Sequence, residues 1–377
     1  MKILVAGDFC PIQRVAHYFK EADYGFVLEE VREKVEQSDY AIVNFECPVC
    51  KGGERPIVKR GPHLKCDWHG VEAVKWAGFD CVTLANNHFL DYGETGAAFT
   101  IEMLRKYGID MVGGGLNMNE AKRIFYKEVG DHSMAIINCC EHEFSLATKT
   151  SAGSNPLNPI NQYYDILEAK KKADYVIVIV HGGHEMFILP SLRMQDIYRF
   201  FIDVGADAVI NNHQHCYSGY EVYQGKPIFY GLGNLCFDMT DMIGDLWNTG
   251  MMVSFSFDVD TIHFTLYPYT QCKEEAKIEF MDGERMIQFN NHINELNRII
   301  SDREKLTEAV NKYFASGLRR TKTVFEPIHN RYFNGLQARG YLPSFISDKR
   351  IMKLYNVWFC ESHREKVDFF LEQWSRK

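Results

Sequence analysis

The sequence predicts an α/β fold followed by a helical extension. Three observations predict it. Short β-branched runs alternate with helix-like stretches over the first 210 residues, glycine directly follows three of those stretches, and the pattern is helical from about residue 282 onwards. Strand–helix alternation is typical of layered α/β folds, and glycine is favoured just after a helix. A chain of 377 residues is long enough for one large α/β domain with an appendage.

The predicted elements of the first part follow the chain in order. The apolar β-branched runs predict strands at 2–6, 40–44, 81–85, 134–138, 175–180 and 208–210. The stretches between them predict helices at 26–36, 67–77, 94–107, 161–172 and 192–204. Gly78, Gly108 and Gly205 stand directly after three of these helices.

The pattern changes after residue 210. Residues 220–230 predict a hairpin, and 251–258 with 262–267 predict a second pair of strands. Further on, Ile293, Leu296 and Ile300 recur at the spacing of one face of an amphipathic helix. We therefore predict one domain over 1–270 and a mainly helical extension over 271–377.

Composition excludes several classes of protein. The chain carries 42 Lys and Arg against 50 Asp and Glu, a net charge of −8 without a basic block, which argues against a nucleic-acid partner. No stretch reaches the roughly 18 apolar residues of an integral membrane segment. The N-terminal MKILVAGDF lacks the features of a signal peptide, and the 11 cysteines are scattered. These features predict a cytoplasmic protein with reduced thiols.

Polar side chains gather where the predicted strands end. In α/β sheets, ligands bind outside the carboxyl ends of the strands. Five strand ends carry carboxylates, amides and imidazoles but no Lys or Arg: Gly7-Asp8, Asn44-Phe45-Glu46, Asn86-Asn87-His88, His181-Gly182-Gly183-His184-Glu185 and Asn211-Asn212-His213-Gln214-His215. Alternate residues of an extended segment point the same way, so we expect His213 and His215 to face one site.

This set of side chains predicts a site for one or two divalent metal ions. Histidine and carboxylate are common ligands of catalytic Mn, Fe or Zn. Each motif alone has a simpler explanation, since Gly-Asp is often a turn and a single His at a strand end is usually structural. The prediction rests on the same class of side chain recurring at the same end of successive strands.

The ordered motifs resemble the CapA family of capsule and poly-γ-glutamate synthesis proteins, which is related to the calcineurin-like metallophosphatases. The resemblance covers roughly residues 1–270 and is carried by the first two strand ends together with LANNHFLDYG, GGGLNMNEA, HGGHE, GADAVINNHQH and GKPIFYGLGNLCFD. It implies a metallophosphatase-like four-layer β-sandwich of mixed sheets flanked by helices.

The resemblance also implies roles for individual residues. Asp8 and His215 would bind the first metal ion, and Glu46 would bridge both ions. Asn87, His181 and His213 would bind the second ion. His88 would be the catalytic proton donor, with Asp91 orienting it. Many calcineurin-like enzymes carry a histidine where this chain has Cys10, so the resemblance leaves open whether one ion or two bind.

The activity we expect is metal-dependent hydrolysis of a phosphoester, on a phosphorylated or polymeric substrate, in the synthesis of capsule polysaccharide or poly-γ-glutamate. Two alternatives stay open: a non-catalytic accessory protein that binds metal or polymer, and an amide or peptide hydrolase with the same metal centre. The aromatic residues near the C-terminus favour internal packing or contact within a homo-oligomer.

Overall fold

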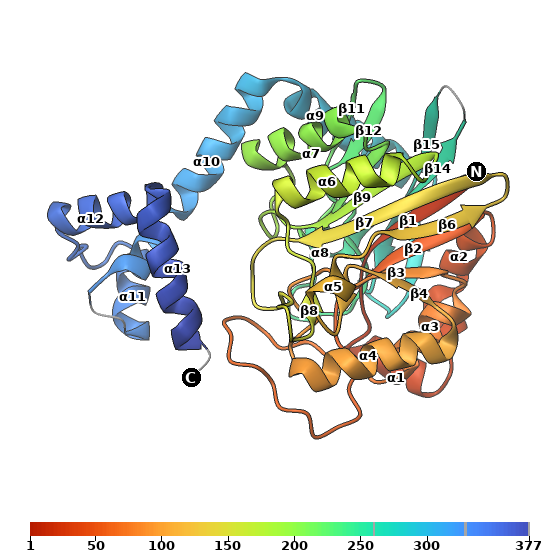
Figure 1. Cartoon of the computed structure of the whole chain (residues 1–377), viewed down its shortest axis with the longest axis horizontal. Coiled ribbons are helices and arrows are strands. Elements are labelled where there is room, and N and C mark those ends of the chain that lie inside the picture. Colours follow the sequence, from red (N-terminus) through yellow and green to blue (C-terminus); the bar gives the residue numbers. More distant parts are fainter. Residues whose placement is uncertain (259–260, 328–329, 376–377) are drawn as a thin grey trace. The chain divides into compact units, whose positions relative to one another are not determined.

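The structure, a computed structural model, describes residues 1–258, 261–327 and 330–375, with side chains as far as Leu371. The chain divides into two compact units, Met1–Leu306 and Thr307–Lys377. The first unit contains two mixed β-sheets with helices on their outer sides (Figure 1). This arrangement confirms the four-layer sandwich of mixed sheets that the sequence predicts.

The first sheet has the order β16-β15-β14-β1-β2-β3-β4, and β13 also pairs with β1. Strands β1 to β4 run parallel, and β14 to β16 are antiparallel to their neighbours. The bounds are β1 Lys2–Cys10, β2 Tyr40–Phe45, β3 Cys81–Thr83, β4 Asp110–Val112, β13 Asn234–Phe237, β14 Thr249–Phe257, β15 Ile262–Gln271 and β16 Ile278–Phe280.

The second sheet has the order β11-β12-β10-β9-β7-β6, with a parallel centre and antiparallel edge strands. Its central strand β9 reads YVIVIVH and is buried throughout, as expected of a parallel strand covered on both faces. The bounds are β6 Phe125–Val129, β7 His132–Cys140, β9 Tyr175–His181, β10 Ala208–Asn212, β11 Tyr220–Tyr223 and β12 Lys226–Phe229; a separate pair comprises β5 Gly114–Gly115 and β8 Gly153–Ser154.

Aromatic side chains join the two sheets. The ring of Phe229 on β12 lies 5.6 Å from that of Phe255 on β14, measured between centroids. Tyr175 on β9 lies 4.8 Å from Phe257 on β14. Because these rings are buried between strands of different sheets, they fix the distance between the sheets.

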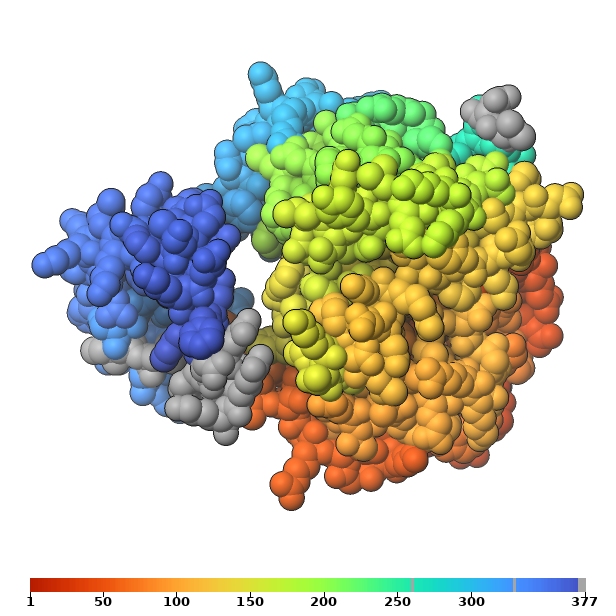
Figure 2. Space-filling view, viewed as in Figure 1, coloured from red at the N-terminus to blue at the C-terminus, as the bar shows by residue number. Residues whose placement is uncertain are grey.

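Helices cover the outer faces of the sandwich. In the space-filling view, the yellow and green residues of α6 and α7 form an outer layer of the first unit (Figure 2). Two of the predicted helix ends are confirmed, since Gly108 and Gly205 are the C-cap residues of α4 and α7. The helices are α1 Gln13–Lys20, α2 Tyr24–Val35, α3 His69–Trp76, α4 Gly93–Tyr107, α5 Met118–Ala121, α6 Pro159–Lys170, α7 Leu192–Val204, α8 Asp245–Asn248 and α9 Gly283–Ser301.

The second unit is helical. Helix α10, Arg303–Lys322, begins four residues before it. The unit continues with the short helix η1 Thr323–Phe325, α11 Arg331–Ala338, α12 Asp348–Phe359 and α13 Glu361–Ser375. In the described part of the chain, no helix combines the length and the apolar character needed to span a bilayer.

The end of β1 that carries Asp8 is positioned by β2 and β13, which pair with β1 there. β1 pairs with both β2 and β13 near Asp8, and the register shifts at that point. A Cβ on Gly7 would lie only 1.9 Å from the carbonyl oxygen of Gly233. Glycine is therefore required at position 7, and the close approach fixes Asp8 at the edge where both sheets end.

The boundary near residue 271 stays a prediction, and the structure supplies a test of it. Helix α9 buries Phe289, Ile293, Leu296 and Ile300, and Asn297 Oδ1 accepts a hydrogen bond of 2.7 Å from the backbone N–H of Tyr220. Each of these apolar side chains contributes about 1.5–3 kcal/mol when fully buried.

We expect a chain ended at Leu306 to remain folded and to bind metal. A chain ended at residue 271 should unfold at a markedly lower urea concentration or aggregate, because it lacks the edge strand β16 and exposes the surface that α9 covers. Urea unfolding followed by circular dichroism measures the stability of the two truncated chains, and elemental analysis measures their metal content. The full chain is the control. Equal midpoints for the two truncated chains would show that β16 and α9 add nothing to the stability of the first unit.

Candidate metal centre

Asp8 and Glu46 bring two carboxylates to neighbouring strand ends of the first sheet. Asp8 lies near the end of β1, Glu46 directly follows β2, and both side chains are fully buried. Among the described residues, neither carboxylate oxygen of Glu46 has a hydrogen-bond partner. Burial, with the charge of Asp8 adding to it, raises the pKa of Glu46 well above its usual range. An ionised carboxylate at this position therefore requires a cation beside it.

Three histidines reach the same place from the second sheet. His181 is the last residue of β9, while His213 and His215 follow β10, and all three are buried. The extended backbone expected between His213 and His215 is wrong, because both residues have positive φ, 95° and 56°. Such conformations cost of order 1–3 kcal/mol in non-glycine residues and are common where a site constrains the backbone.

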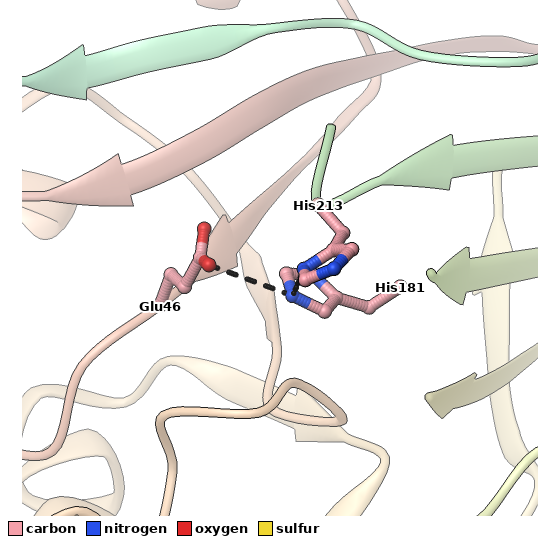
Figure 3. Close-up of side chains that lie close together, drawn as sticks. All are labelled: Glu46, His181 and His213. Carbon is pink, nitrogen blue, oxygen red and sulfur yellow. Dashed lines mark hydrogen bonds and ion pairs between the residues drawn. The ribbon is translucent and has the colours of Figure 1, made fainter. Parts of the chain in front are cut away.

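These five side chains form two overlapping groups of possible metal ligands. One group is Glu46, His181 and His213, and the other is Asp8, Glu46 and His215. In each group the ligand atoms lie within 4.8 Å of one another. Figure 3 shows Glu46 facing the two imidazoles of its first group. Since Glu46 belongs to both groups, its carboxylate could contribute an oxygen to either of them.

The surroundings of His181 fit a metal ion. Its Nε2 lies 3.0 Å from Asn87 Oδ1, 3.1 Å from His213 Nδ1 and 3.5 Å from Glu46 Oε1. One ring N–H can donate to only one of these groups, whereas a cation among them accepts lone pairs from all four. Burial, reinforced by the neighbouring histidines, lowers the pKa of His181 well below its usual value, which keeps it neutral as ligation requires.

His215 has a different environment. Its Nδ1 lies 3.0 Å from Asn234 Oδ1 and 3.5 Å from Asp8 Oδ2. The Asn234 amide nitrogen already donates to two backbone carbonyls, so its oxygen accepts from the Nδ1–H of His215. Burial opposes protonation of His215, but the hydrogen bond and charge of Asp8 outweigh it and raise its pKa. Nε2 remains available on the side of Glu46, 3.9 Å from Oε1.

Asn44 connects the two sheets beneath the site, a role that sequence analysis did not assign. Its Nδ2 donates to Asp8 Oδ1 over 2.7 Å and lies 3.3 Å from His181 Nδ1. Its Oδ1 accepts from Thr83 Oγ1 over 3.1 Å. The signal was its position within the strand-end motif Asn44-Phe45-Glu46, and its buried amide contacts both Asp8 and His181.

His88 and Asp91 lie together beside the two ligand groups. His88 Nδ1 is 2.7 Å from Asp91 Oδ2, which also accepts the backbone N–H of Leu64 over 2.7 Å. Burial outweighs the carboxylate and lowers the pKa of His88. The Asp91 contact leaves His88 Nε2 free for another partner.

Lys59 also belongs to the site, although the sequence motifs did not predict it. Its side chain is only 2% exposed, and Nζ forms an ion pair with Asp91 and lies 3.1 Å from His88 Nδ1. Lys59 belongs to the irregular segment between β2 and α3, not to a strand end. The only signal was the basic pair Lys59-Arg60 within a Gly- and Pro-containing stretch, which is more often a solvated loop.

A cavity of about 230 Å³ opens beside these residues. Lys59 and Arg60 line it together with the carboxylates Glu143 and Glu185. Its remaining lining includes His88, Asn87, His215, Phe237, Met239, Met242 and Trp247. The cavity therefore joins the ligand groups to His88 and to one exposed cationic side chain, Arg60.

Cys10 lies outside both ligand groups. Burial raises the pKa of its thiol to about 11, so it stays protonated near neutral pH.

A family model of bacterial capsule synthesis proteins, PGA_cap, matches residues 2–239, more than half of the chain. The chain belongs to this family. The resemblance found in the sequence motifs is thereby confirmed, and it extends over the strands that carry every predicted site residue.

Two PGA_cap relatives are clearly similar in sequence. The chain is 33% identical over 246 residues to the capsule biosynthesis protein CapA of Bacillus anthracis, which covers 63% of this chain and 60% of that protein. It is 34% identical over 215 residues to the PGA biosynthesis protein CapA of Bacillus subtilis strain 168, covering 56% and 57%. The chain thus matches less than two thirds of the length of these relatives.

Solved structures align over most of the chain at low identity. A hypothetical protein from Thermus thermophilus aligns with a TM-score of 0.48 and 16% identity, covering 72% of this chain and 99% of its own. A novel phosphatase of Mycoplasma pneumoniae aligns with a TM-score of 0.45 and 15% identity, covering 77% and 98%. Neither score reaches 0.5.

Because Glu46 belongs to both ligand groups, replacing it should remove more metal than replacing a residue of one group. We expect Glu46→Gln to lose most of the metal from both ligand groups, because the neutral amide no longer offsets the repulsion between two cations. His213→Ala should lose metal from its own group and retain the other ion. Elemental analysis of the purified protein gives the number of ions per chain.

His184→Ala is the matched control, since this half-buried histidine follows the same strand but belongs to neither group. It should keep the metal content of the unmodified protein. Full metal content in Glu46→Gln, or in the double variant His181→Ala with His213→Ala, would contradict the site.

Proposed function

We propose that this PGA_cap protein is a metal-dependent hydrolase of phosphoester bonds that acts in the synthesis of capsule polysaccharide or poly-γ-glutamate. One observation carries the proposal. Two groups of three buried ligands share Glu46, whose two oxygens lack hydrogen-bond partners among the described residues. A shared carboxylate between two sets of nitrogen and oxygen ligands is the arrangement that two-metal hydrolases use.

The residues that would hold the metal divide between the two groups. Asp8 and His215 would hold one ion, His181, His213 and Asn87 the other, and Glu46 would bridge them. Divalent ions bound in this way supply an activated water molecule and offset the negative charge of a transferring phosphoryl group. Mn, Fe and Zn all suit this mixture of imidazole and oxygen ligands.

His88 would move the proton in this reaction. Its Nδ1 contact with Asp91 fixes the orientation of the ring, so that Nε2 can carry a proton to the leaving oxygen of the substrate. The ion pair with Lys59 holds the carboxylate of Asp91 in place. Arg60, on the wall of the cavity, would bind a negatively charged substituent of the substrate.

The proposal predicts hydrolysis that depends on added metal. We expect the purified protein, supplied with Mn²⁺, Fe²⁺ or Zn²⁺, to hydrolyse an aryl phosphate monoester or diester, as measured by release of the phenol. Glu46→Gln is the control and should be inactive with each metal. No turnover with any of the metals would favour the accessory-protein alternative, and release of glutamate from poly-γ-glutamate without phosphatase activity would favour the amide hydrolase.

A second prediction separates the proton donor from the metal ligands. His88→Ala should retain its metal and lose about 10²–10⁴-fold in rate on an alkyl phosphate, whose poor leaving group needs a proton. The loss should be much smaller on a nitrophenyl ester, because nitrophenolate leaves without protonation.

Asn87→Ala is the comparison variant, and we expect it to weaken metal binding before it affects the leaving-group dependence. Both variants are tested by rate measurements alongside elemental analysis. An equal loss of rate by His88→Ala on good and poor leaving groups would contradict its role as general acid.

A further inference from the structure

The second unit differs from the first in charge. Residues 307–377 contain 13 Lys and Arg against 7 Asp and Glu, whereas the whole chain has a net charge of −8. The 71 residues of this unit therefore carry a net charge of +6, and residues 1–306 carry −14. A basic segment within an acidic chain indicates a negatively charged partner.

The second unit also exposes much of the apolar surface of the chain. In the described residues, 32 large apolar side chains are exposed, and 17 of them belong to residues 314–371. Single exposed apolar side chains need no explanation, but this density in a small unit indicates a surface that binds something apolar.

Helix α12 concentrates both properties. Five of its large side chains are 45–65% exposed: Ile351, Met352, Tyr355, Trp358 and Phe359. At 100° per residue they fall within one arc of the helix. The half-buried Leu354 and Val357 occupy a different side of the helix.

Basic residues border this apolar face. Lys349 and Lys353 lie at the edge of the apolar face that Met352 forms. Arg350 lies further around the helix from that edge. Helix α13 packs beside α12 within the same unit (Figure 1). A groove between the two helices is lined by Phe359 and Val367, with Lys366 among its polar residues.

We propose that the exposed apolar face of α12 binds the surface of an anionic lipid bilayer. An amphipathic helix with Trp, Tyr and Phe on one face and Lys or Arg beside it suits the interface, where the rings sit at the level of the headgroups. The lysine side chains extend along the apolar face and reach the anionic headgroups. Helix α12 carries three basic residues against one acidic residue, Asp348, and this positive charge is complementary to such a surface.

The same features fit a protein partner less well. An acidic protein surface attracts the lysines, but it offers no continuous apolar layer to five exposed side chains of one helix. The 15 exposed large apolar side chains of the first unit are spread over 306 residues. A bilayer supplies both the negative charge and the apolar layer.

Co-sedimentation of the full chain with vesicles tests the proposal. We expect binding to phosphatidylcholine vesicles that contain phosphatidylglycerol, much weaker binding to phosphatidylcholine alone, and weakening by salt. Lys349→Glu with Lys353→Glu should lower the partition coefficient at least about tenfold. Trp358→Ser with Phe359→Ser should lower it by a similar factor, because it removes two of the largest apolar side chains from the face.

Matched controls come from the first unit. Ile160→Ser with Tyr164→Ser removes side chains that are 69% and 65% exposed on α6, and Lys20→Glu with Lys51→Glu changes two exposed lysines. Circular dichroism establishes that each variant is folded. The controls should bind vesicles like the unmodified chain.

Three outcomes would overturn the proposal. The first is no binding to anionic vesicles, and the second is an equal loss of binding in the control variants. The third is a dimer in sedimentation velocity that the α12 variants dissociate while vesicle binding is absent, which would make this face a contact between copies of the chain.

Discussion

Glu46 imposes the constraint on which the site depends. Its side chain is fully buried, and neither of its oxygens is hydrogen-bonded within the described residues. Burying an ionised carboxylate without partners costs several kcal/mol, a large fraction of the roughly 5–15 kcal/mol that stabilises a typical domain. A chain that places such a group between three histidines and a second carboxylate needs either a proton or a cation there. The neutral, low-pKa imidazole of His181 beside it favours the cation.

The two ligand groups depend on the packing of the two sheets. The carboxylates Asp8 and Glu46 come from the first sheet, and the three histidines come from the second. Each group therefore exists only while the sheets keep their separation, which the rings of Phe229 and Phe255 fix. Asn44 links the sheets directly at the site.

The sequence predicted those parts of the fold that local patterns determine. The strand β9 and the helix α7 were found because a buried parallel strand is a continuous apolar run and glycine ends the helix. The strand β13 was missed, because four residues give little periodicity and its partner β1 lies more than 200 residues away. Pairing at that distance is decided by tertiary packing.

The same distinction between local sequence patterns and tertiary packing explains which residues of the site were predicted. The convergence of its side chains was predictable, because parallel strands end at one edge of a sheet and residues at strand ends therefore meet. Lys59 was not predictable, because an irregular segment of the chain brings it to Asp91. The conformation of His213 and His215 was also beyond local rules, since positive φ is uncommon at non-glycine residues and the sequence gives no sign of it here.

The charge of the first unit bears on how an anionic substrate would reach the cavity. Residues 1–306 carry a net charge of −14, which opposes a phosphate at long range. At physiological ionic strength, however, interactions between exposed charges are screened beyond about 8 Å. Recognition therefore depends on charges within the cavity, where Arg60 is exposed and the charge of Lys59 is offset by Asp91. With Glu143 and Glu185 also on the wall, cations held by the buried ligands would make the larger contribution to binding an anion.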